Sequence, residues 1–191
     1  DVSAEVGHYC FTEQEIDAFT NPYWAPELIY DEETDKYYLF YTGHNSSGVM
    51  EYNEKIMVAV SDNLTSFEKI EDWAITPDIT LGQKNDFRDP QAYYDPETGI
   101  ISMTITASQN NTARIIKYSV SADLQNVTYD GIIFTNPVGK FWNLECTDTF
   151  KIGDKWYVTY SAQDDTLWYA SSENRYGPYG EPKRLEGKLF Y

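Results

Sequence analysis

Hydrophobic positions along the chain gather in short runs that polar turns separate. The runs "KYYLFYT" at 36–42, "IISMTIT" at 100–106 and "KWYVTYS" at 155–161 are β-branched or aromatic at nearly every position. Such runs are typical of strands buried on both faces. Each follows a turn-forming segment, "DEETD", "DPETG" or "KIGD". The pattern predicts an all-β protein, with one short isolated helix expected at 11–19.

The chain also repeats itself. The segment Asn21–Tyr41 falls without a gap on Asn85–Ile105, and 6 of the 21 positions are identical. A third copy, Glu145–Tyr160, follows with a one-residue gap in its turn. Repeating units of this kind, each with three or four antiparallel strands, are typical of the blades of a β-propeller. A β-sandwich with coincidental similarity between its strands is the alternative.

We therefore predict part of a five-bladed β-propeller, with about three four-stranded antiparallel blades present in one domain. The domain spans 1–191, and its expected blade-like repeats lie near 21–84, 85–143 and 144–180. The apolar run that closes the sequence has no turn after it, which is typical of a truncated domain. Unpaired strands at the edges of such blades favour self-association.

Composition narrows the class of ligand. With 31 acidic and 14 basic residues the net charge is −17, which disfavours nucleic acid and anionic membranes as partners. Aromatic residues make up 16% of the chain and can stack on sugar rings. No apolar run reaches the length of a membrane span. Two cysteines and two histidines predict no metal or other cofactor, and nothing in the sequence indicates a compartment.

Two acidic residues fall on the first strands of neighbouring repeats, which line the central channel of a propeller. The repeat aligns Asp89 with Glu145, while the first copy has Ala25 there. Paired carboxylates suit glycoside hydrolysis, in which one protonates the leaving oxygen and another stabilises or attacks the sugar. Arg88 could hold Asp89 ionised, and Cys146 is expected to fill the core. A lone Asp-Pro that starts a strand is, however, often only a turn or cap.

These segments resemble a known family. "FRDP" at 87–90 and "ECTDTFKIGDKWYVTYS" at 145–161 are similar to the Arg-Asp-Pro and Glu-Cys motifs of glycoside hydrolase family 32, which cleaves sucrose and fructans. The resemblance implies a five-bladed propeller that transfers fructofuranosyl groups to water with retention of configuration. It makes Asp89 the transition-state stabiliser, Glu145 the general acid/base and Arg88 the residue that orients the carboxylates.

One family feature is missing. The nucleophile of the family is an Asp in an Asn-Asp-Pro-type motif of the first blade, and this sequence has no such motif. Ala25 would then lie in blade two, Asp89 in blade three and Glu145 in blade four. A retaining mechanism without its nucleophile should not turn over, so we expect an inactive fragment of an active parent enzyme.

Two other functions remain open. A glycoside hydrolase of family 43, which cleaves arabinan and xylan on the same type of propeller, resembles "WAPELIYDEETDKYYLFYT" equally well, although it usually has Glu-Gly in place of Glu-Cys. A carbohydrate-binding propeller without catalysis is the other. In each case Trp24 and Trp142 are candidate substrate-binding platforms, with core packing as the alternative for both.

Overall fold

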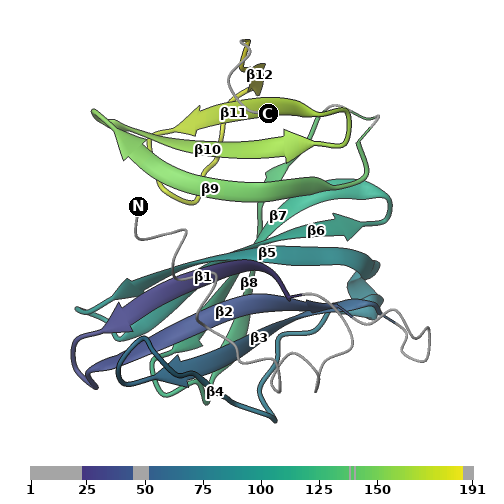
Figure 1. Ribbon diagram of the computed structural model, residues 1–191. Coiled ribbons are helices and arrows are strands. Elements are labelled where there is room, and N and C mark those ends of the chain that lie inside the picture. Colours follow the sequence, from purple (N-terminus) through teal and green to yellow (C-terminus); the bar gives the residue numbers. More distant parts are fainter. Residues whose placement is uncertain (1–22, 45–51, 138, 140, 187–191) are drawn as a thin grey trace.

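The computed structural model describes residues 23–44, 52–137, 139 and 141–186, and its regular elements are strands apart from one short 3-10 helix (Figure 1). The expected helix at 11–19 lies outside the described residues. One short 3-10 helix, η1, spans Ile79–Leu81. The strands, in chain order, are β1 (Tyr23–Asp31), β2 (Lys36–His44), β3 (Glu54–Ser61), β4 (Glu68–Lys69), β5 (Gln83–Asp95), β6 (Ile100–Gln109), β7 (Thr112–Ser121), β8 (Val127–Thr135), β9 (Leu144–Ile152), β10 (Lys155–Ala162), β11 (Thr166–Ser172) and β12 (Lys183–Arg184).

The strands form three separate four-stranded antiparallel sheets, as the repeat predicts. Their orders are β1-β2-β3-β4, β5-β6-β7-β8 and β12-β11-β10-β9, so each sheet is a simple meander of consecutive strands. This is the topology of propeller blades. The β-sandwich alternative is wrong, because the described strands make three sheets rather than two facing ones.

The first strand of each sheet is its inner strand. β1 packs beside β5, and β5 beside β9, so the three inner strands follow one another where the sheets meet (Figure 1). One core joins the first two sheets, with Phe40 and Phe87 among its fully buried members. A second core, around Leu144 and Tyr160, joins the second sheet to the third. Packing between neighbouring sheets therefore fixes how the inner strands approach one another.

The middle strands differ in burial. β2 is buried from its third to its eighth residue, and β6 has five consecutive buried residues, as expected for strands covered on both faces. In β10 buried residues alternate with partly exposed ones, so the prediction is wrong for that strand. The third sheet has a described neighbour, the second sheet, on one side.

The repeated turn has a physical cause. Asp31 accepts hydrogen bonds from the backbone N–H of Glu33 at 3.0 Å and from the Thr34 hydroxyl at 2.6 Å. Asp95 accepts the same pair of bonds in its own turn, from the backbone N–H of Glu97 at 3.0 Å and from the Thr98 hydroxyl at 2.8 Å. The "D-x-E-T" identity between repeats therefore encodes a turn in which one carboxylate orders the backbone.

A β-bulge interrupts each inner strand at the same place. Two residues of the inner strand face one of its neighbour between Trp24 and Glu27, between Arg88 and Gln91, and again in β9. The residues at the bulges with positive φ are Ala25 (45°), Asp89 (56°) and Cys146 (50°). Bulges re-aim side chains and occur often at functional sites.

The bulges correct the alignment of the repeats. Asp89 corresponds to Cys146, and Glu145 corresponds to Arg88 and Trp24, one residue away from the sequence alignment. The error arose in the turn: four residues separate β1 from β2 and β5 from β6, but only two separate β9 from β10, whereas the sequence alignment allowed a gap of one. The two acids are therefore not equivalent.

Candidate active site

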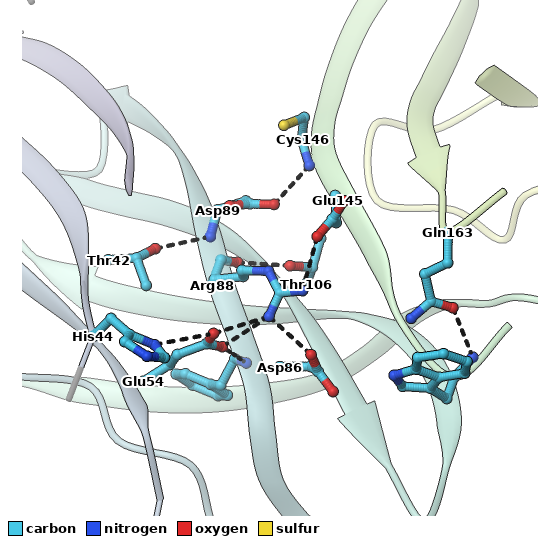
Figure 2. A network of polar contacts seen from close by, with 12 residues as sticks. Thr42, His44, Glu54, Asp86, Arg88, Asp89, Thr106, Glu145, Cys146 and Gln163 are labelled. Atoms are coloured by element: carbon cyan, nitrogen blue, oxygen red, sulfur yellow. Dashed lines mark hydrogen bonds and ion pairs between the residues drawn. The ribbon is translucent and has the colours of Figure 1, made fainter. Parts of the chain in front are cut away.

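The site is built around one guanidinium group. Arg88 lies on β5 just before the bulge, and its side chain is only 13% exposed. Its Nη1 donates to both oxygens of Glu54, at 2.9 and 3.1 Å, and to Asp86 Oδ1 at 2.9 Å. Its Nη2 donates to Glu145 Oε1 at 2.9 Å. Burial lowers the pKa of Arg88, but the surrounding carboxylates outweigh it and hold that pKa above its usual range. Arg88 is thus a fixed cation that links its own sheet to the two neighbouring sheets (Figure 2).

Glu145 is the most accessible acid of the network. Its side chain is 45% exposed, against 5% for that of Glu54. It lies on β9, in the sheet next to that of Arg88, and only one of its oxygens accepts from Arg88. A carboxylate held from one side and open on the other can exchange a proton with a bound ligand.

Asp89 lies beside Glu145 but is held differently. Its backbone N–H donates to Thr42 Oγ1 at 3.0 Å, and its Oδ2 accepts from the Cys146 N–H at 2.7 Å. The residue is 6% exposed. Burial is the main cause that raises the pKa of Asp89; the Cys146 N–H and Arg88 oppose it, and the charges of Glu145 and Glu54 add to it.

The predicted partner of Arg88 is wrong. The hydrogen bonds described for its side chain go to Glu54, Asp86 and Glu145 rather than to Asp89. Instead, the carboxylate of Asp89 is fixed by a backbone N–H of the neighbouring inner strand. The two candidate acids still lie in one cluster, as Figure 2 shows: Glu145 bonds Arg88, and Asp89 bonds the N–H of Cys146, the residue after Glu145.

Cys146 does not fill the core. Its thiol is free and the residue is exposed, because positive φ at the bulge turns the side chain away from the buried face. The partial desolvation of the thiol, followed by the charges of Asp89 and Glu145, raises the pKa of Cys146. A raised pKa leaves little thiolate at neutral pH, so Cys146 is a poor nucleophile. Its backbone N–H, rather than its sulfur, serves the site.

Glu54 is the residue that the sequence analysis missed. It opens β3, is 4% exposed, and also accepts from the Phe87 N–H at 2.7 Å. The His44 ring lies near it, with Nδ1 3.6 Å from Oε1. The only signal in the sequence is an acid at the head of the apolar run "KIMVAVS". Its partner stands 34 residues away, so only the packing of the two sheets brings them together.

The two candidate tryptophans lie in different surroundings. Trp24 precedes the bulge of β1, is half-buried, and packs against the His44 ring with centroids 4.6 Å apart. It therefore adjoins the network through His44 and Glu54. Trp142, before β9, is 52% exposed, and its backbone N–H donates to Gln163 Oε1 at 3.3 Å. Core packing is thus excluded for Trp142, whose ring is open to solvent.

A second group of polar side chains follows the bulges. Glu27, Gln91 and Asp148 are the next equivalent residues of the three inner strands. Gln91 bonds Asp148, and its Oε1 accepts from the N–H and hydroxyl of Thr149 at 2.9 and 2.7 Å. Burial raises the pKa of Glu27 to about 7; a hydrogen bond with the backbone of Ala92 opposes this shift, and Asp148 adds to it. The inner strands are thus joined by polar contacts on both sides of the bulge.

Two absences hold for the part of the chain that the structure describes. No three His, Cys, Asp or Glu side chains there gather closely enough to hold a metal ion. No helix within the same residues is long and apolar enough to cross a membrane.

The fold and the site together define a class. Inner strands of blades that bring two carboxylates and an arginine together offer the groups that glycoside hydrolysis uses. The N-terminal domain of glycosyl hydrolases family 32 matches residues 13–181. The chain therefore belongs to glycosyl hydrolase family 32, and its three sheets are blades of a five-bladed propeller.

Solved structures agree on the fold. The GH32 β-fructofuranosidase BmSUC1 of Bombyx mori is 24% identical, with a TM-score of 0.65 over 88% of this chain and 37% of its own. Fructan 1-exohydrolase IIa of Cichorium intybus is 18% identical, with a TM-score of 0.63 over 78% of this chain and 30% of its own. An exo-β-1,3-galactanase of Clostridium thermocellum is 16% identical, with a TM-score of 0.62 over 86% and 36%.

The chain thus spans about a third of each of these structures. A search among curated proteins found no match.

Proposed function

We propose that the full-length protein containing these blades hydrolyses β-fructofuranosides with retention of configuration, and that Asp89 and Glu145 are two of its catalytic carboxylates. The observation that carries the proposal is the hydrogen bond of 2.9 Å from Arg88 Nη2 to Glu145 Oε1. It fixes Glu145 near Asp89, which lies on the neighbouring inner strand. Membership of family 32 favours fructosides over other sugars. A variant of BmSUC1 has been solved in complex with sucrose, which makes sucrose the first substrate to test.

The two acids have different roles in this proposal. Glu145 is the general acid/base, because it is the more exposed of the two and can reach a leaving oxygen. Asp89 is buried and held by the Cys146 N–H, so it binds sugar hydroxyls and stabilises the oxocarbenium-like transition state. Arg88 orients Glu145. Trp142 and Trp24 are the proposed surfaces for stacking of sugar rings.

A retaining mechanism also needs a carboxylate nucleophile. Glu54 is the other buried acid of the cluster, but both its oxygens accept hydrogen bonds from Arg88 and one also accepts from the Phe87 N–H. A carboxylate so engaged is unsuited to attack. We propose that the nucleophile comes from another blade of the parent protein, and that the 191-residue chain alone does not turn over.

The test uses the full-length parent with Asp89→Asn and Glu145→Gln. Each protein is incubated with sucrose, inulin, levan and an aryl arabinofuranoside, and the released sugars are measured. Fructose release by the parent that falls by about 1,000-fold in both variants supports the proposal. The exposed Glu68→Gln and Asp62→Asn serve as matched controls and should keep full activity.

Two other results would reject the proposal. Release of arabinose instead of fructose would assign the protein a family 43-like activity. Absence of release from every substrate by a folded parent, together with measurable binding of the sugars, would make it a carbohydrate-binding propeller. In that case Asp89 and Glu145 would bind ligand without catalysing its cleavage.

A further inference from the structure

Glu54 holds Arg88 from the side opposite Glu145. Both oxygens of its carboxylate accept hydrogen bonds from Arg88 Nη1, at 2.9 and 3.1 Å. Arg88 Nη2 donates to Glu145 at 2.9 Å. The same Glu54 carboxylate also fixes the backbone beside Arg88, by accepting from the Phe87 N–H at 2.7 Å. The Glu54 side chain therefore restrains both the guanidinium group of Arg88 and the backbone of the preceding residue.

The surroundings leave Glu54 few alternatives. It is 4% exposed and comes from β3, the third strand of the neighbouring sheet, so solvent cannot replace its contacts. The charged or titratable groups near it are Arg88, Asp89 and His44, and the Nδ1 of His44 is 3.6 Å from Glu54 Oε1. Asp86 shares Nη1 but is more exposed, at 26% for its side chain, and it stands on the same strand as Arg88. Glu54 is the buried anchor contributed by another sheet.

We propose that Glu54 is a positioning residue for catalysis: it fixes Arg88, and through Arg88 it sets the position of the acid Glu145. The catalytic part of this inference rests on the proposed function, whereas the anchoring part does not. Pre-organised carboxylates are effective because the reacting group is held where the transition state needs it. Glu54 itself does not contact the substrate, since both its oxygens are engaged inside the protein.

The first experiment tests the anchor without any activity. Crystal structures of the full-length parent and its Glu54→Gln variant are compared at the Arg88 side chain. Glutamine carries no charge and has one acceptor oxygen, so it cannot make all the bonds of Glu54 to Arg88 and the Phe87 N–H; Arg88 should shift and its 2.9 Å contact with Glu145 should be lost. If that contact persists unchanged in the variant, the proposal is overturned. Where Glu54→Gln fails to fold, Glu54→Asp provides the comparison, because it keeps the charge and shortens the reach.

The second experiment tests the effect on Glu145. An acid that protonates the leaving group matters most when that group is poor, as the glucose of sucrose is, and least when it is an acidic phenol. We therefore expect Glu54→Gln to lower kcat/KM on sucrose by about 100-fold and kcat/KM on an activated aryl β-fructofuranoside by about tenfold or less, because kcat/KM reports the step in which the leaving group departs. Glu54→Asp should keep more of the sucrose activity than Glu54→Gln.

The outcomes separate this inference from the proposed function. Equal losses on both substrates would mean that Glu54 only stabilises the fold, and would overturn its positioning role. Glu145→Gln must show the same dependence on the leaving group, and Glu68→Gln neither loss. If the parent cleaves no fructoside at all, the proposed function fails, and the crystal structures still decide whether Glu54 anchors Arg88.

Discussion

Arg88 and Glu145 occupy the same position on the inner strands of two neighbouring blades, immediately before the bulge, and they form a 2.9 Å ion pair. The third member of this position is Trp24, whose ring packs against His44 at the other end of the network. One repeated backbone feature thus presents a cation, an acid and an aromatic ring to one region. Repetition supplies the geometry, and the side chain chosen in each blade supplies the chemistry.

Removal of Arg88 should destabilise the fold as well as the site. Arg88→Ala leaves the carboxylate of Glu54 buried without its cation, and breaking a buried pair in this way costs about 3–5 kcal/mol in the free energy of unfolding. Urea unfolding monitored by tryptophan fluorescence measures the loss.

The matched control is Arg88→Ala in the Glu54→Gln background. With no buried charge left at position 54, the arginine deletion should cost clearly less there than in the wild type. Equal costs in both backgrounds would show that the Arg88–Glu54 pair contributes nothing specific to stability.

The sequence alone predicts much of this fold and only part of the site. The runs at 36–42 and 100–106 and the repeated "D-x-E-T" turns are local signals, and the turns act through bonds within three residues. The partners of Arg88 are different. Glu54 and Glu145 lie 34 and 57 residues away, on two other sheets, and only blade packing reveals them.

The position of Asp89 shows the limit most clearly. A slip of one residue changes which face a strand residue occupies, and the alignment of the third copy slipped by one because its turn is two residues shorter than the other turns rather than one. No residue type in the sequence marks the bulge, because Ala25, Asp89 and Cys146 share positive φ but no chemistry. The repeat placed Asp89 and Glu145 on neighbouring inner strands, as the structure shows, but misjudged which residues are equivalent.

Glu27 should make stability depend on pH. Its pKa is raised from 4.5 to about 7, chiefly by burial, so the folded state binds this proton more tightly than the unfolded state. Stability from this group is fully present below pH 4.5 and is lost as the pH rises through 7. Glu27→Gln stays neutral, and at pH 8 it should exceed the wild type by on the order of 2 kcal/mol, allowing for partial exposure.

Urea unfolding of wild type and Glu27→Gln at pH 4 and pH 8 tests this. The advantage of the variant should be small at pH 4 and large at pH 8. The exposed Glu68→Gln is the control and should show no such difference. An advantage of Glu27→Gln that is the same at both pH values would refute the assignment of the proton to Glu27.

Ala25 should be a place where glycine stabilises. Its φ is 45°, a left-handed conformation that costs a residue with a Cβ roughly 1–2 kcal/mol. Ala25→Gly removes this strain but adds freedom to the unfolded chain, so we expect a net gain of about 0.5 kcal/mol. Ala59→Gly, on a regular stretch of β3 outside the bulges, should instead lose about 1 kcal/mol or more. A loss at both sites, measured by thermal unfolding, would show that the bulge carries no strain.

Trp73 provides a last prediction, because it joins two blades away from the site. It follows β4 of the first sheet, packs on Phe40 with ring centroids 5.6 Å apart, and donates from Nε1 to the Leu124 carbonyl at 3.0 Å. Leu124 lies in the turn between β7 and β8 of the second sheet. Trp73→Phe keeps an aromatic ring but leaves a buried carbonyl without this donor and a gap in the core. It should cost about 2–3 kcal/mol in the free energy of unfolding.

The effect of Trp73→Phe should be confined to stability. No contact described for Trp73 reaches Arg88, Asp89 or Glu145, so kcat/KM of the full-length parent should stay within about twofold wherever the variant is folded. Trp142→Phe is the opposite control, because Trp142 is 52% exposed. The free energy of unfolding should change by less than about 0.5 kcal/mol, while the affinity for sugar should fall. If Trp73→Phe lowered kcat/KM without loss of stability, the contact between the first two blades would have to position the site directly, as well as hold the blades together.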